Sequence, residues 1–245
     1  MLFRGLRWAL VAVLLLMVAA CGGETPAATP TVASPTATPV PPTATSAAAT
    51  DEGVQQPESG APAAEPRTFV IDPAQSEARF IINEVLLGAP TEVTGATNQV
   101  EGTIEIDPNA PASTVLSPIV INARELKTDR NLRDRAIRRF ILQSADDKYQ
   151  FITFTPTSIE GLPANAAAGD TFAFTVNGDL TIRDITAPVT FDVTVTPVST
   201  GELQGSGKAT VRYADFGISI PSVPMVAGVD EQVQLEIDFT AKAAS

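Results

Sequence analysis

The stretch TFAFTVNGDLTIRDITAPVTFDVTVTPV, residues 171–198, contains the pattern that decides the fold. In its second half Val189, Phe191 and Val193 alternate with polar residues. A period of two places apolar side chains on one face of a β-strand and polar side chains on the other. The stretch therefore predicts strands that have one buried face and one exposed face.

The same alternation recurs along most of the chain from residue 67 onward. Further strands are predicted at 68–71, 78–87, 115–123, 150–159 and 205–213. About eight or nine strands with short connections, and without the helices that parallel sheets require, predict an all-β antiparallel barrel or sandwich. The apolar residues expected to point into its interior are Phe80, Ile82, Ile104, Ile106, Phe172, Phe174, Val189, Phe191, Val193, Leu235, Ile237 and Phe239.

One stretch, TDRNLRDRAIRRFIL at 128–142, departs from the period of two. Its apolar residues recur at helical spacing, which predicts an amphipathic helix from about 129 to 142 with Thr128 or Asp129 as N-cap. A single helix in such a domain is expected to cover or flank a barrel mouth. The residues predicted to meet a ligand there are Leu132, Arg133, Ile137, Arg138, Phe140 and Ile141. The alternative is that the arginines are solvated or paired with local carboxylates.

The composition excludes several kinds of function. The chain has 16 basic and 28 acidic residues and a net charge of −12, which argues against a nucleic-acid partner. It has no histidine and one cysteine, so Ser–His–Asp and Cys–His catalysis are excluded and the usual metal ligands are missing. We therefore expect a binding protein with no cofactor and no metal, rather than an enzyme.

The N-terminal region predicts export. Residues 1–20 have the basic start and short apolar run of a signal peptide, and LMVAAC at 16–21 resembles a bacterial lipobox with Cys21 as the acylated residue. Residues 21–66 are rich in Ala, Thr and Pro, a composition typical of a disordered stalk. The expected product is a domain at 67–245, anchored through Cys21 on the extracytoplasmic side of a bacterial cell membrane.

Several segments of this domain together resemble the YceI family of exported lipid-binding proteins. They are FVIDPAQSEARFI at 69–81, LKTDRNLRDRAIRRFIL at 126–142, YQFITFTPTSIEG at 149–161, VNGDLTIRDITAPVTFDVTV at 176–195, GKATVRYADFGISIP at 207–221 and EQVQLEIDF at 231–239. The resemblance implies a lipocalin-like antiparallel barrel whose apolar interior binds an isoprenoid or a similar long-chain amphiphile. The arginines expected at the barrel mouth would select an anionic or quinone-like headgroup over a cationic one. Gln75 stands where many relatives have histidine, which puts any headgroup contact at that position in doubt.

Two other functions remain open at this point. The same strand pattern permits a β-sandwich interaction module displayed on the stalk, with a packed core and no ligand. A carboxylate-dependent hydrolase would need two inward acidic residues, for which Asp215, Asp230 and Glu231 are the candidates. The pattern leaves the oligomeric state open, and a dimer is one option.

Overall fold

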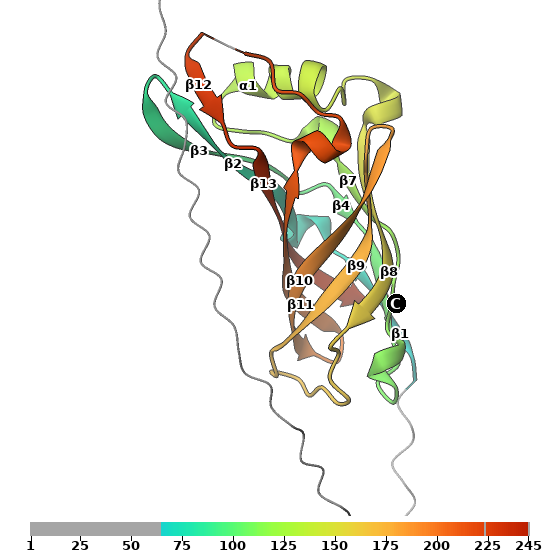
Figure 1. Ribbon diagram of the computed structural model, residues 1–245. Coiled ribbons are helices and arrows are strands. Elements are labelled where there is room, and N and C mark those ends of the chain that lie inside the picture. Colours follow the sequence, from blue (N-terminus) through green and yellow to red (C-terminus); the bar gives the residue numbers. More distant parts are fainter. Residues whose placement is uncertain (1–64, 223, 245) are drawn as a thin grey trace, which may run out of the picture. The chain divides into compact units, whose positions relative to one another are not determined.

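The stretch at 171–198 forms the central hairpin of the protein in the computed structural model, which describes residues 65–222 and 224–244 (Figure 1). Strands β9 (Phe172–Ile182) and β10 (Ile185–Ser199) pair in antiparallel register, with Val176 opposite Phe191 and Phe174 opposite Val193. The two-residue turn holds Arg183 at a φ of 59°. The alternation therefore gives strands as predicted.

The hairpin belongs to a larger antiparallel sheet. Its other strands are β1 (Arg67–Ile71), β2 (Glu77–Leu86), β3 (Ala89–Thr97), β4 (Val100–Glu101), β5 (Thr103–Ile106), β6 (Val115–Leu116), β7 (Ile119–Asn122), β8 (Phe151–Glu160), β11 (Glu202–Arg212), β12 (Val226–Val229) and β13 (Gln232–Ala243). Short 3-10 turns lie at Pro73–Gln75, Pro111–Ser113, Ala123–Glu125, Asp147–Tyr149 and Tyr213–Phe216. The helix α1 (Asn131–Ala136) continues into a π-helical turn, Ile137–Ile141.

The sheet curls into a half-barrel (Figure 1). Its strands follow the order β7, β8, β9, β10, β11, β13, β1 and β5, and β2 pairs with the first half of β13. The short strand β4 pairs with β7 at one edge of the sheet. Strand β5, which follows β4 in the chain, pairs with β1 near the other edge. The segment that contains β4 and β5 therefore contacts both edges of the curled sheet. This architecture is the predicted all-β barrel with one helix at its end.

Three parts of the sheet differ from the prediction. The stretch 115–123 is two short strands, β6 and β7, because Pro118 interrupts it. Strand β3 was not predicted, since its sequence APTEVTGAT contains a proline and a glycine and few large apolar residues. Strand β12 was missed as well. Both β3 and β12 pair with β2 and extend the sheet at the helix end of the half-barrel.

The predicted helix forms, but the predicted N-cap is wrong. The residue at the N-cap position is Arg130, and its side chain makes no capping hydrogen bond. Instead the Oδ1 atom of Asp134, within the helix, accepts hydrogen bonds from the N–H of Thr128 at 2.8 Å and from its hydroxyl at 2.7 Å. Asp134 is buried. Its carboxylate therefore holds Thr128, and with it the segment that precedes the helix, from the buried side.

The core lies on the concave side of the curled sheet. Its buried side chains come from strands far apart in the sequence, such as Phe69 of β1, Leu180 of β9 and Leu203 of β11. Phe216, in the 3-10 turn after β11, is only 1% exposed. Burial of these side chains holds the strands together, and each contributes about 1.5–3 kcal/mol.

Candidate functional site

The curled sheet encloses a cavity of about 950 Å³. Side chains of β1, β2, β5, β8, β9, β10, β11 and β13 form its wall, and α1, the π-helical turn and the start of β12 border one end. The wall is apolar apart from a few charged groups. This volume lies near the upper end of the range for ligand cavities, about 300–1,000 Å³. The interior of the half-barrel is therefore hollow.

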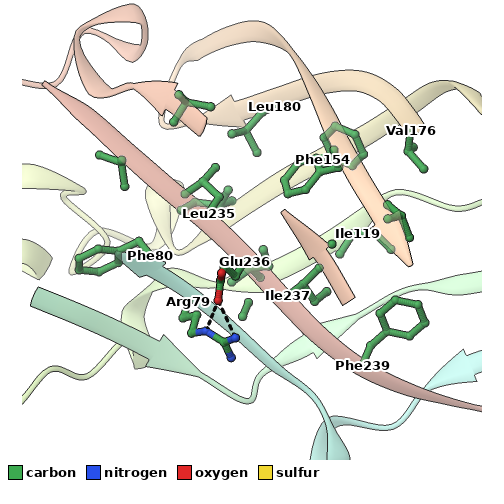
Figure 2. Close-up of a pocket in the computed structure, with 18 of the residues that line it drawn as sticks. Arg79, Phe80, Ile119, Phe154, Val176, Leu180, Leu235, Glu236, Ile237 and Phe239 are labelled. Carbon is green, nitrogen blue, oxygen red and sulfur yellow. Dashed lines mark hydrogen bonds and ion pairs between the residues drawn. The ribbon is translucent and has the colours of Figure 1, made fainter. Parts of the chain in front are cut away.

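The residues predicted to face the interior lie at this wall, with one exception. Those that border the cavity are Phe80, Ile82, Ile104, Ile106, Phe172, Phe174, Phe191, Val193, Leu235, Ile237 and Phe239. Figure 2 shows four of them, Phe80, Leu235, Ile237 and Phe239, in the cavity wall together with Phe154 and Val176. Val189 differs, because it is buried in the core at 8% exposure and does not border the cavity.

Two aromatic rings of the wall lie over glycines of the neighbouring strand. Phe80 of β2 is opposite Gly95 of β3, and Phe239 of β13 is opposite Gly205 of β11. A Cβ atom at Gly205 would lie 2.6 Å from the Phe239 ring and 2.7 Å from the backbone oxygen of Thr194. A Cβ atom at Gly95 would overlap the Phe80 ring. The absent side chains thus leave room for the rings that shape the cavity.

The helix borders the mouth of the cavity with residues of two kinds. In the π-helical turn Ile137 is 8% exposed, and Ile141 is half-buried and packs against the core. Leu132 and Phe140 also border the cavity, but they are 76% and 64% exposed. All four residues predicted to meet a ligand thus border the cavity, but only Ile137 and Ile141 are shielded from solvent. Leu132 and Phe140 lie at the outer edge of the mouth.

The mouth carries one well-shielded ion pair. Arg133 of α1 lies 2.7 Å from a carboxylate oxygen of Glu84 on β2, and these side chains are 17% and 11% exposed. Both residues border the cavity. Arg133 also pairs with Asp129, four residues earlier. Two carboxylates thus offset the positive charge of Arg133, which matches the alternative that arginines pair with local carboxylates.

Arg138, the other arginine predicted to meet a ligand, does not border the cavity. It follows Ile137 by one position, so its side chain leaves the helix in a different direction. Its Nε atom is buried and has no hydrogen-bond partner among the described residues. Gln75 also lies away from the cavity wall, and its amide donates to Asp72 at 3.1 Å.

A charged cluster ties β2, β11 and β13 together beside the cavity (Figure 2). Glu236 lies between Leu235 and Ile237 and points to the opposite face of β13. Its carboxylate is 2.6 Å from Arg79 and 2.8 Å from Lys208, and it accepts a hydrogen bond from Gln234 at 2.6 Å. The Lys208 hydrogen bond is the largest influence, and with Arg79 and Gln234 it lowers the Glu236 pKa to about 2.

The carboxylates considered for hydrolysis do not form such a site. Asp215, Asp230 and Glu231 are exposed, and none borders the cavity. Asp230 accepts a hydrogen bond from Asn83 at 3.1 Å, and Glu231 pairs with Arg212 at 3.2 Å. Within 65–222 and 224–244, no three acidic residues are grouped so that they could hold a metal ion.

Sequence reasoning missed part of the mouth. Ile220, Met225 and Val226 border the cavity, and they belong to the segment ISIPSVPMV at 218–226. Two prolines interrupt any strand or helix period there, so only the local concentration of apolar residues could have indicated a buried role.

No helix among residues 65–222 and 224–244 is long and apolar enough to span a bilayer.

Comparison with known proteins agrees with this architecture. The family model of a YceI-like domain matches residues 69–241. Searching the curated proteins gives no match.

Two solved structures share the fold. A polyisoprenoid binding domain from Saccharophagus degradans is 13% identical, with a TM-score of 0.56, and the match covers 72% of this chain and 98% of that one. The protein BcnA from Burkholderia cenocepacia is 20% identical, with a TM-score of 0.54, and the match covers 70% of this chain and 99% of that one. Since both matches cover nearly all of the other chain, those two chains consist of this fold and little else.

Proposed function

Because this chain belongs to the family of YceI-like domain proteins, we propose that it binds a long-chain lipophile, such as an isoprenoid, in the cavity of its half-barrel and catalyses no reaction. The observation that carries the proposal is the cavity of about 950 Å³ with an apolar wall. The Saccharophagus degradans protein that shares the fold is a polyisoprenoid binding domain, which adds support.

The energetics of an apolar wall suit such a ligand. Each methylene group moved from water into the cavity contributes about 0.8 kcal/mol, so a long chain is held firmly without many polar contacts. Leu235, Ile237 and Phe239 lie along one strand at alternate positions and offer a continuous apolar surface. A packed β-sandwich module with no ligand would leave such a cavity without a role.

The mouth favours a neutral polar headgroup over an anionic one. Arg133 is the cavity-bordering arginine closest to full burial at this end, but Glu84 and Asp129 already offset its charge. The pair still offers N–H donors and carboxylate acceptors to a hydroxyl group or a quinone oxygen. We therefore expect a quinone-like or alcohol headgroup at the α1 end of the cavity.

The N-terminal sequence supports a proposal about where the protein acts. The predicted signal peptide (1–20), lipid anchor (Cys21) and stalk (21–66) lie outside the described residues, except that positions 65 and 66 are described. We propose that the domain at 67–245 works on the extracytoplasmic side of a bacterial membrane. Labelling of the full chain with a radioactive fatty acid tests the anchor, because Cys21→Ser should abolish the label.

The test of ligand binding is native mass spectrometry of the chain from residue 65, purified without detergent from an isoprenoid-producing host. The expected result is a complex with one bound species, whose mass and identity follow from organic extraction. A protein that stays ligand-free after incubation with quinones, polyprenols and fatty acids would overturn the proposal and favour the interaction module.

A further inference from the structure

The mouth of the cavity is surrounded by exposed apolar side chains. Leu87, Leu132, Phe140 and Met225 are 76%, 76%, 64% and 60% exposed. The last three also border the cavity, and the N–H of Leu87 donates to the backbone oxygen of Met225 at 2.8 Å. Figure 1 places α1, β12 and the turn between β2 and β3 at the same end of the half-barrel. We call these four residues the apolar rim.

Two exposed arginines accompany the apolar rim on the helix. Residues 132, 135, 136, 139 and 140 follow helical spacing and share one face. On this face Arg135 and Arg139 are exposed, and among the described residues neither has a carboxylate partner within ion-pair distance. Arg133, by contrast, is turned toward Glu84. The outer face therefore combines large apolar groups with positive charges that are not neutralised.

This positive charge is local. Between residues 127 and 139 the sequence has six basic residues and two acidic ones, although the whole chain has a net charge of −12. Of the two acidic residues, Asp129 pairs with Arg130 and Arg133, and Asp134 is buried against Thr128. Charges act over roughly 8 Å at physiological salt, so an approaching surface responds to this face rather than to the net charge.

We infer that this end of the half-barrel docks onto a bilayer that contains anionic lipids. Leu132 and Phe140 enter the boundary between headgroups and acyl chains, and Arg135 and Arg139 contact lipid phosphates, as expected for an amphipathic helix that lies in the interface. Docking places the cavity mouth against the bilayer, so a lipid passes between membrane and cavity without crossing water. The inference goes beyond ligand binding, since a docked surface needs no occupied cavity.

A second copy of the chain is a poorer occupant of this surface. A symmetric dimer applies the same patch to itself. It would bring the Arg135 and Arg139 side chains of two copies together with few local carboxylates to offset them, and like charges in contact are unfavourable. Lipid phosphates supply the missing negative charge.

The test is co-sedimentation of the chain from residue 65 with vesicles. One set of vesicles is pure phosphatidylcholine, and the other contains phosphatidylglycerol as well. We expect binding to the anionic vesicles alone, weakened by salt. Arg135→Gln and Arg139→Gln should each weaken binding roughly fivefold. The pair Leu132→Ser and Phe140→Ser should weaken it further, with little effect on folding because both side chains are exposed.

Matched controls lie at the opposite end of the half-barrel. Val115 is 57% exposed, Val198 is 47% exposed and Lys242 is 46% exposed. Changing the valines to serine and the lysine to glutamine should leave vesicle binding unchanged. Equal binding to both vesicle types, or equal losses in the controls, would overturn the inference. So would a dimer that Leu132→Ser and Phe140→Ser dissociate without any vesicle binding. Extraction of bound lipid from the same samples tests the cavity separately.

Discussion

Arg133 and Glu84 join α1 to β2 across the mouth of the cavity through an ion pair of 2.7 Å. The guanidinium group of Arg133 thus stays at the mouth, with its positive charge offset by the Glu84 carboxylate. Replacing Glu84 with glutamine keeps the shape of the side chain and removes one of the two carboxylates that offset Arg133. We expect Glu84→Gln to raise the affinity for a fatty acid, relative to the alcohol of the same chain length, by on the order of tenfold.

Competition with a fluorescent fatty-acid analogue measures this ratio. Glu105→Gln is the control, because Glu105 is an exposed residue of β5 and the substitution changes the net charge by the same amount. If both variants shift the ratio equally, the local charge of Arg133 does not select the headgroup.

Leu235→Trp should fill the middle of the cavity without displacing the sheet. Leu235 borders the cavity from β13, so a larger side chain extends into empty space rather than into packed atoms. We expect the amount of co-purified lipid to fall at least about tenfold, a loss of roughly 1.4 kcal/mol or more, while the unfolding midpoint changes little. Quantitative extraction of lipid from equal amounts of protein provides the measurement.

The matched control for this variant is Val70→Trp. Val70 lies on β1 and is 43% exposed, so the added ring stays outside the barrel. Normal lipid content in Leu235→Trp would mean that the ligand does not occupy the space beside β13.

Glu236 should make stability depend on pH in the acid range. Its folded pKa of about 2 lies below the ordinary value of 4.5, so its ion pairs stabilise the fold fully above pH 4.5 and are lost as the pH falls toward 2. A shift of this size corresponds to roughly 3 kcal/mol at most, since salt screens the exposed partner Lys208. Urea unfolding at about pH 6 and about pH 2.5 should show this loss in the wild type.

Glu236→Gln should unfold more easily than the wild type at the higher pH and approach it at the lower pH. Glu231→Gln serves as control, because Glu231 is 74% exposed and its pair with Arg212 adds little. A constant difference between Glu236→Gln and wild type at both pH values would contradict the assignment.

Gly205→Ala should destabilise the protein. The new methyl group would meet the Phe239 ring and the Thr194 backbone oxygen, and the backbone atom cannot rotate away. Overpacking of this kind costs about 1–3 kcal/mol. Gly201→Ala provides the comparison, since nothing lies within 4 Å of the position where its Cβ atom would be. Thermal unfolding measures both variants. Equal unfolding midpoints for Gly205→Ala and Gly201→Ala would show that the close approach of β11 and β13 at Gly205 does not affect stability.

The strands on both sides of the cavity could be predicted because they alternate clearly. From Val189 to Thr196 in β10 and from Val233 to Thr240 in β13, each apolar residue is followed by a polar one. Strand β3 could not be predicted in this way. Its place in the sheet depends on its pairing with β2, because Gly95 leaves room for the Phe80 ring on the opposite strand. A contact between two strands cannot be seen in the sequence of one of them.

The site was less predictable than the fold. Helical spacing places Leu132 and Ile137 in an amphipathic helix but does not decide which edge of the apolar stripe meets the sheet. In the structure Asp134 is on the buried side of the helix, where it accepts hydrogen bonds from Thr128, and Leu132 is on the exposed side. Whether the interior is hollow depends on how far the curled strands stay apart, a long-range property that no local pattern contains.

Strand β13 also joins parts of the chain that lie far apart in the sequence. It pairs with β11 on one side and with both β1 and β2 on the other. Lys242 of β13 and Asp72, which follows β1, form an ion pair across a sequence separation of 170 residues. Contacts this distant give a high contact order, which slows folding. Until residues 232–243 have been synthesised, β1 and β2 lack the strand that joins them to β11, and the half-barrel is completed only after translation of nearly the whole chain.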